Sequence, residues 1–188
     1  MKFSLQQDAS QLDTASSVIL PLAKPAEGTD TLTTDSLKAA DKLLNGAISH
    51  AIASGDLSSK FNTSQLFLNA GPGPDRILVI GTGAADKLSG RKYRQLVQGA
   101  WSQISSNPGS NVFNQLTIAD TNILDLKSKV RLTVEAMVQA CYRFDQFKSA
   151  AKEVLPNPDM ALLADTDTQT QLEQSVATAE AMNLCRDL

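Results

Sequence analysis

The chain has 188 residues, a formal net charge of −3, two cysteines and a single histidine. This length suffices for one domain that folds without a disulfide or metal staple. The negative charge argues against a dedicated nucleic-acid-binding domain, because such domains carry a cationic excess. The N-terminus lacks an apolar signal segment, and no apolar run nears the roughly 18 residues that span a bilayer. We therefore expect a cytoplasmic protein with reduced thiols and no membrane contact.

The N-terminal third alternates short apolar runs with one amphipathic segment. Phe3–Leu5 and Ser17–Leu22 have the composition of β-strands, and the second is apolar enough to lie in the centre of a sheet. Apolar residues at helical spacing then predict a single helix over residues 34–54. Its expected N-cap is Thr33 or Thr34, since a threonine hydroxyl can accept from the first free backbone N–H groups.

The middle of the chain repeats the alternation of strand and helix. Two strands are expected at Ser64–Leu68 and Arg76–Ile80, joined by a stretch rich in Gly, Pro and Asn. An amphipathic stripe predicts a helix from about Ser89 to Ser105. A further strand is expected over Asn111–Ile118.

The C-terminal third has two helical patterns separated by a short strand. The first helix is expected from about Leu126 to Lys148, and the strand over Met160–Leu163. The last helix begins at a cap at Thr166 or Thr168. It meets no Gly, Asn or Pro stop signal before Leu188, so we expect it to continue into a further segment.

Strands that alternate with helices predict a three-layer α/β domain, with a mixed, mostly parallel sheet between helices. We expect this domain over residues 1–165. Residues 166–188 then form a helix that leads out of it.

Few residues have the spacing that catalysis or metal binding needs. The run that ends in Gly81-Thr82-Gly83 resembles the start of a dinucleotide-binding turn, but Asp86 stands where the third glycine belongs. His50 has no acidic partner nearby in sequence, which favours a helix-surface residue over a catalytic base. Cys141 and Cys185 are too far apart for a C-x-x-C pair. We therefore expect no catalytic residue, metal ligand or cofactor within this chain.

One local cluster of basic residues stands out. Its members are Lys87, Arg91, Lys92 and Arg94, with Asp86 as the single acidic neighbour. A solvated helix face explains it most simply. The alternatives are a surface for an acidic partner or for a nucleic-acid backbone.

Four segments, in order, resemble the N-terminal domain of the leucyl (cytosol) aminopeptidases. They are Arg76–Gly83, Tyr93–Gln98, Tyr142–Lys148 and Asn183–Leu188. The resemblance covers almost the whole chain and is weakest over residues 1–30. In the last segment, Cys185 stands where the family usually has alanine.

The resemblance implies a macro-domain-like fold and a parent enzyme that is a hexameric, cytoplasmic metallo-aminopeptidase. That enzyme would use two divalent metals, zinc, manganese or magnesium, in a catalytic domain that begins beyond this chain. The family's metal ligands and catalytic lysine and arginine all lie there, so none is assigned to a residue here. The resemblance also implies a role in assembly and regulation, and in some bacterial members a part in DNA binding.

Two alternatives to an accessory aminopeptidase domain remain open. The first is a stand-alone macro-like module that binds ADP-ribose or a related nucleotide. It is weakened by the prolines beside Gly71 and Gly73, which cannot donate backbone N–H groups to a phosphate. The second is DNA binding through the basic cluster, which the net charge of −3 disfavours.

Overall fold

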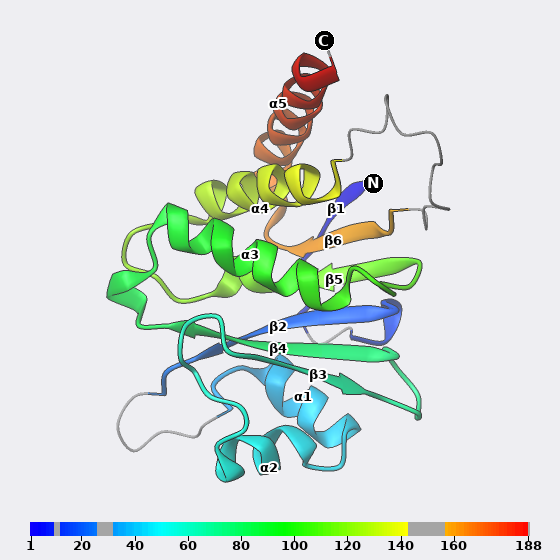
Figure 1. Cartoon of the computed structure of the whole chain (residues 1–188), viewed down its shortest axis with the longest axis vertical. Helices are drawn as coiled ribbons and strands as arrows, with labels where there is room; N and C mark the ends of the chain where they lie inside the picture. Colours follow the sequence, from blue (N-terminus) through cyan, green and yellow to red (C-terminus); the bar gives the residue numbers. More distant parts are fainter. Residues whose placement is uncertain (10–11, 26–31, 143–156, 188) are drawn as a thin grey trace.

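A six-stranded sheet forms the centre of the described structure (Figure 1). The computed structural model describes residues 1–9, 12–25, 32–142 and 157–187. The strands are β1 (Phe3–Gln6), β2 (Ser17–Ala23), β3 (Ser64–Leu68), β4 (Arg76–Gly83), β5 (Asn111–Asn114) and β6 (Asp159–Leu163). Their order is β1-β6-β5-β2-β4-β3, and all neighbours pair in parallel except β3 and β4. The predicted mixed, mostly parallel sheet is confirmed.

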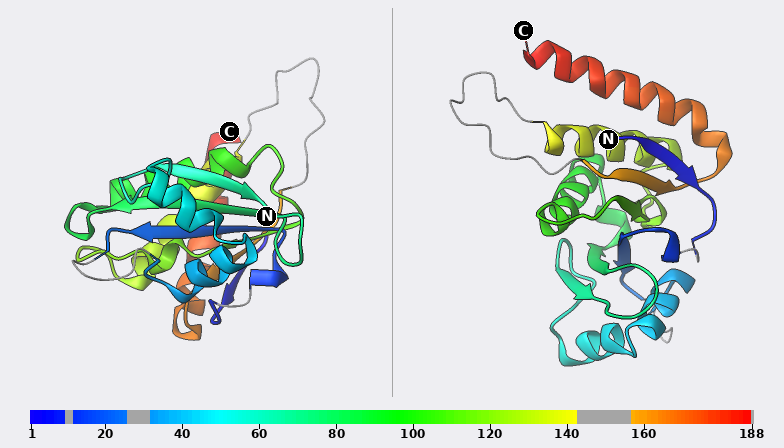
Figure 2. Two further views of the ribbon diagram at one scale, coloured as in Figure 1. Left: turned by 90° about the horizontal axis from the view of Figure 1, so that it is seen from below. Right: turned by 90° about the vertical axis from the view of Figure 1, so that its right-hand side faces the viewer.

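Helices cover both faces of this sheet (Figures 1 and 2). One face carries α1 (Asp35–Leu43) and α2 (Ala47–Ser54), and the other carries α3 (Gly90–Ile104) and α4 (Leu126–Cys141). The last helix, α5 (Gln169–Asp187), packs along α4 and also contacts β1. The described residues also include four short 3₁₀ helices: η1 (Leu12–Thr14), η2 (Ala85–Lys87), η3 (Leu116–Ile118) and η4 (Thr166–Thr168). The three-layer α/β class is thereby confirmed.

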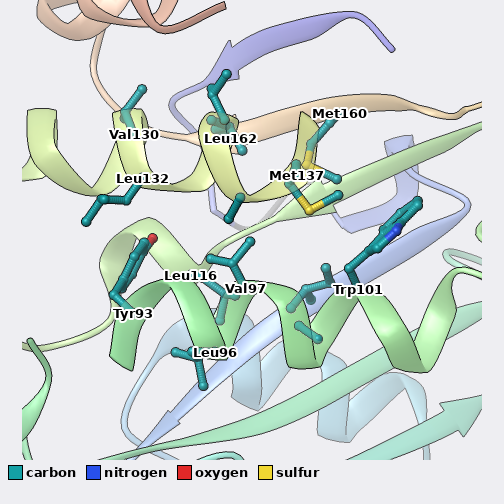
Figure 3. Close-up of a cluster of buried hydrophobic side chains, with 14 of the residues drawn as sticks. Tyr93, Leu96, Val97, Trp101, Leu116, Val130, Leu132, Met137, Met160 and Leu162 are labelled. Carbon is teal, nitrogen blue, oxygen red and sulfur yellow. The ribbon is translucent and has the colours of Figure 1, made fainter. Parts of the chain in front are cut away.

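Alternate side chains of the central strands point into two separate hydrophobic cores, because successive strand residues face opposite sides of a sheet. Val18 and Leu20 of β2 lie in the core under α1 and α2, whereas Ile19 lies in the core under α3 and α4. Side chains from α3, α4 and β6 meet in the second core (Figure 3). A strand buried on both faces must be apolar throughout, which explains the composition of β2 and β4.

The segment over residues 34–54 folds as two helices, so the prediction of one continuous helix is wrong. The chain breaks at Asn45 and Gly46, whose φ angles of 52° and 84° are left-handed. Asparagine and glycine tolerate this conformation better than other residues do, and here they end α1 and redirect the chain into α2. Thr34 is the N-cap, as expected, and its Oγ1 accepts from the Leu37 N–H at 3.3 Å.

Two other predicted elements are too long. The strand that begins at Asn111 ends at Asn114, whose Oδ1 accepts from the Leu116 N–H at 2.9 Å and helps turn the chain into η3. The helix α4 ends at Cys141, and Tyr142 is extended with a ψ of 130°. The predicted end of this helix at Lys148 lies outside the described residues, as does most of the motif over residues 142–148.

The final helix begins differently from the prediction. Asp165 takes the N-cap position of η4 without a capping side-chain bond, and the Thr168 hydroxyl donates to the Asp165 carbonyl at 2.7 Å. Neither Thr166 nor Thr168 is therefore an N-cap. Leu172 and Ala179 of α5 are both 2% exposed, so one side of this helix packs into the core. In the described part of the chain, no helix combines the length and the apolar character needed to cross a membrane.

Candidate functional site

A cavity of about 510 Å³ lies where β2 and β4 end. In sheets with parallel strands, ligands bind preferentially at the carboxyl ends of the strands. The wall consists of residues from four parts of the chain: Lys24, Ser58, Ser59, Lys60, Phe61, Thr82, Gly83, Ala84, Lys87 and Lys92. A volume of this size is in the range of about 300 to 1,000 Å³ that small-molecule sites occupy.

Four lysines dominate the electrostatics of this cavity. Lys24 follows β2, Lys60 precedes β3, Lys87 ends η2, and Lys92 lies in the first turn of α3. Among the described residues, none that lines the cavity is acidic, and none of the four ammonium groups forms a salt bridge with another described residue. The topology therefore brings Lys24 and Lys60 from distant parts of the sequence to the neighbouring pair Lys87 and Lys92.

Two glycines of β4 allow the loop over residues 58–61 to form one wall of the cavity. A Cβ atom on Gly81 would lie 2.2 Å from the Lys60 carbonyl oxygen, and Gly83 has a left-handed φ of 77°. The Gly83 N–H donates to the Ser59 carbonyl at 2.9 Å, and the Asn62 N–H donates to the Gly81 carbonyl at 2.8 Å. The Gly-x-Gly turn thus holds the protein's own loop, which agrees with its interpretation as a tight structural turn.

An aromatic ring positions one of the lysines. The Lys92 Nζ lies 5.5 Å from the centre of the Phe61 ring, a distance at which a cation is attracted to the ring face. Phe61 belongs to the same loop that Gly81 and Gly83 accommodate. This contact links α3 to the loop across the cavity mouth.

The structure divides the basic cluster that was predicted from sequence. Lys87 and Lys92 line the cavity, whereas Arg94 points to α4 and pairs with Glu135. Arg131 of α4 also pairs with Glu135, at 3.3 Å. Arg91 is exposed on α3. Two of the four residues thus line the cavity, and a partner or nucleic-acid surface formed by all four stays a prediction.

Sequence reasoning missed Lys24 and Lys60. A signal for Lys24 was present, because it directly follows a predicted parallel strand and so belongs at the carboxyl edge of the sheet. No such signal exists for Lys60, which comes before an antiparallel strand and reaches the edge only because its loop folds over Gly81.

The remaining candidates stay apart from one another. His50 is exposed on α2, Cys141 is half-buried at the end of α4, and Cys185 is exposed on α5. Across the described residues, no group of three or more His, Cys, Asp or Glu side chains is placed to hold a metal ion. We therefore derive no metal-dependent step from this chain.

Comparisons with known proteins point to one family. Residues 19–151 match the cytosol aminopeptidase family, N-terminal domain. A probable cytosol aminopeptidase of Stutzerimonas stutzeri is 30% identical over 195 residues, covering 100% of this chain and 38% of the relative. The cytosol aminopeptidase of Pseudomonas aeruginosa is 33% identical over 159 residues, covering 81% of this chain and 32% of the relative.

Solved structures share the fold. A tomato leucine aminopeptidase mutant superposes with a TM-score of 0.72 at 19% identity, over 96% of this chain and 36% of the other. The bottromycin maturation enzyme BotP gives a TM-score of 0.63 at 18% identity, over 93% of this chain and 32% of the other. The chain thus spans about a third of the length of these proteins. On the match over residues 19–151 and the identities to these relatives, the chain belongs to the cytosol aminopeptidase family, in the region of its N-terminal domain.

Proposed function

We propose that this chain is the non-catalytic, assembly and regulatory domain of a leucyl aminopeptidase that removes N-terminal amino acids from peptides. The observation that carries the proposal is the match of residues 19–151 to the family's N-terminal domain.

The catalytic chemistry would belong to a domain that follows residues 166–188. BotP has been solved in complex with Mn, which supports a metal requirement in the wider group of proteins with this fold. Two divalent ions, zinc, manganese or magnesium, would there activate a water molecule and stabilise the tetrahedral oxyanion. We assign no residue of this chain to that centre.

The path from residues 1–165 into the catalytic domain would run through α5. The end of this helix carries Met182 and Leu184, which are 50% and 65% exposed. Apolar side chains in such positions suit a contact with another domain. We further propose that the parent enzyme assembles into a hexamer in the cytoplasm. The likeness of this domain to macro domains stays a prediction.

The relatives do not favour a stand-alone nucleotide-binding or DNA-binding module, since those described above carry aminopeptidase names. Arg94 of the predicted DNA surface is paired to Glu135, which would reduce its attraction to a phosphate, and DNA binding stays a prediction. An accessory aminopeptidase domain remains the function with the best support.

Enzyme assays with two polypeptides test the proposal. One is the 188-residue chain, and the other is the product of the source gene read through and beyond the codon for Leu188. With Mn²⁺ and leucine p-nitroanilide, we expect hydrolysis by the longer polypeptide and none by the 188-residue chain. A stop codon directly after Leu188, or hydrolysis by the short chain, would contradict the proposal that catalysis belongs to a domain outside these 188 residues.

A further inference from the structure

We propose that the lysine-lined cavity at the carboxyl ends of β2 and β4 binds a small anion that carries a diphosphate group. The site is independent of the aminopeptidase assignment, because it is argued from this domain alone. Its walls come from the segment after β2, the loop over residues 58–61, the end of β4 and the start of α3.

Charge is the first argument. Lys24, Lys60, Lys87 and Lys92 line one cavity, and none of its other described lining residues carries a carboxylate. Like charges brought together repel one another, and in the described structure no salt bridge offsets this repulsion. A bound anion would relieve it, and the shape of the site would concentrate the positive potential on that anion.

Free hydrogen-bond donors are the second argument. The Ser58 and Ser59 side chains line the cavity and are half-buried. Neither hydroxyl makes a hydrogen bond within the described part of the chain. Serine hydroxyls and lysine ammonium groups are common donors to phosphate oxygens, and lysine binds phosphate as a point charge.

Size and charge favour a diphosphate over a single phosphate. The cavity holds about 510 Å³ and is lined by four lysines. A linked pair of phosphates carries more negative charge to balance four ammonium groups than one phosphate does, and the volume has room for it. The contact between Lys92 and the Phe61 ring holds one ammonium group in place before the ligand arrives.

Calorimetric titration of the 188-residue chain with sodium pyrophosphate at low ionic strength tests the site. We expect saturable binding, with orthophosphate and citrate at least about tenfold weaker. Titration with adenosine diphosphate distinguishes a nucleotide ligand from a ligand that is recognised by its diphosphate group alone. Tighter binding than pyrophosphate would identify a nucleotide, and equal binding would identify the diphosphate group alone. Both results support the site.

Matched double variants locate the binding. Lys60→Gln with Lys87→Gln removes two charges from the cavity and should weaken pyrophosphate binding at least about tenfold. Lys42→Gln with Lys127→Gln removes the same charge from exposed positions outside the cavity and should leave binding unchanged. All four side chains are exposed, so we expect both variants to fold.

Three outcomes would overturn the proposal. They are no saturable binding of millimolar pyrophosphate, equal weakening in the two double variants, and unchanged pyrophosphate binding after Lys60→Gln with Lys87→Gln. Amide resonances provide a second readout. Those of Gly83 and Ala84 should shift on titration, and shifts confined to other parts of the domain would also refute the site.

Discussion

The hydroxyl of Tyr93 on α3 lies 3.0 Å from the hydroxyl of Thr133 on α4. Thr133 donates its own proton to the Lys129 carbonyl at 2.8 Å, so Tyr93 is the donor in the bond between the two side chains. Both side chains are fully buried, and Tyr93 also belongs to the core in Figure 3. A polar bond therefore fixes the position of the two helices within an apolar core.

Tyr93→Phe should destabilise the domain by about 1 kcal/mol. The substitution removes the donor, while Thr133 keeps its bond to the Lys129 carbonyl, so no donor is left buried without a partner. Urea unfolding followed by circular dichroism measures the difference. No change in the free energy of unfolding would mean that this bond contributes nothing to the packing of α3 on α4.

The stability of the domain should fall as the pH rises above about 10. Burial raises the pKa of the Tyr93 hydroxyl above its usual value. Above pH 10 the unfolded chain loses the tyrosine proton while the folded chain keeps it, so folding loses up to about 1.4 kcal/mol per pH unit.

Tyr93→Phe is the control for this pH dependence. The half-buried Lys129, whose pKa burial lowers, titrates in both proteins and cancels in the comparison. Denaturation curves at pH 8 and pH 11 should show a steeper loss of stability for the unaltered chain. Equal slopes would show that Tyr93 ionises as easily in the folded state as in the unfolded one.

Gly81→Ala should destabilise the domain by about 1 to 3 kcal/mol, because the new methyl group would overlap backbone atoms of the loop over residues 58–61. Gly90→Ala is the matched control. At Gly90 the nearest atom to a new Cβ is the Leu132 Cδ1 at 3.5 Å, which is ordinary contact. In thermal unfolding, Gly81→Ala should have a clearly lower midpoint temperature than Gly90→Ala. Equal midpoints would show that the loop shifts without cost to accommodate the new methyl group.

Leu172→Ala and Leu184→Ala should have very different effects, although both residues lie on α5. Leu172 is 2% exposed in the core, so its truncation should destabilise the domain by about 2 to 5 kcal/mol. Leu184 is 65% exposed, so its truncation should change stability by less than about 0.5 kcal/mol. Chemical denaturation tests both values. Comparable losses would mean that the end of α5 packs against the domain.

Glu135→Gln should weaken the contact between α3 and α4 only slightly. Glu135 pairs with Arg94 and Arg131, but both arginine side chains are close to half exposed, so water screens the pairs. We expect the free energy of unfolding, measured by urea denaturation, to fall by less than about 1 kcal/mol, and this difference to shrink as salt is added. A larger loss that does not respond to salt would assign Glu135 a structural role other than ion pairing.

Local patterns in the sequence predicted most of the elements of this fold. Apolar runs located all six strands of the described structure, and the amphipathic stripe of α3 was placed within one residue at each end. Buried residues recur along the sequence with the period of a strand or of a helix, so residues close together in the chain are enough to reveal these elements. The break at Asn45 and Gly46 was also visible as an Asn-Gly pair, but the helical stripe continues through it and outweighed that signal.

The candidate site was only half visible in the sequence. Lys87 and Lys92 stood out because they are close in the chain, and the same closeness suggested a shared surface with Arg91 and Arg94. In the structure Arg94 pairs with Glu135, and Lys60 lines the cavity together with Lys87 and Lys92. Which side chains line the cavity depends on the order of the strands and on how the loop packs over Gly81. Neither can be read from local patterns in the sequence.

The position of β1 has a consequence for the order of folding events. Phe3 pairs with Met160 and Gln6 with Leu163, so in the described sheet β1 has β6 as its sole neighbour. During synthesis the first strand leaves the ribosome long before its partner, and the entropy of closing so long a loop must be overcome before their pairing contributes. We therefore expect β1 to join the sheet last. A growing chain would carry an unpaired N-terminal strand until residue 163 has emerged.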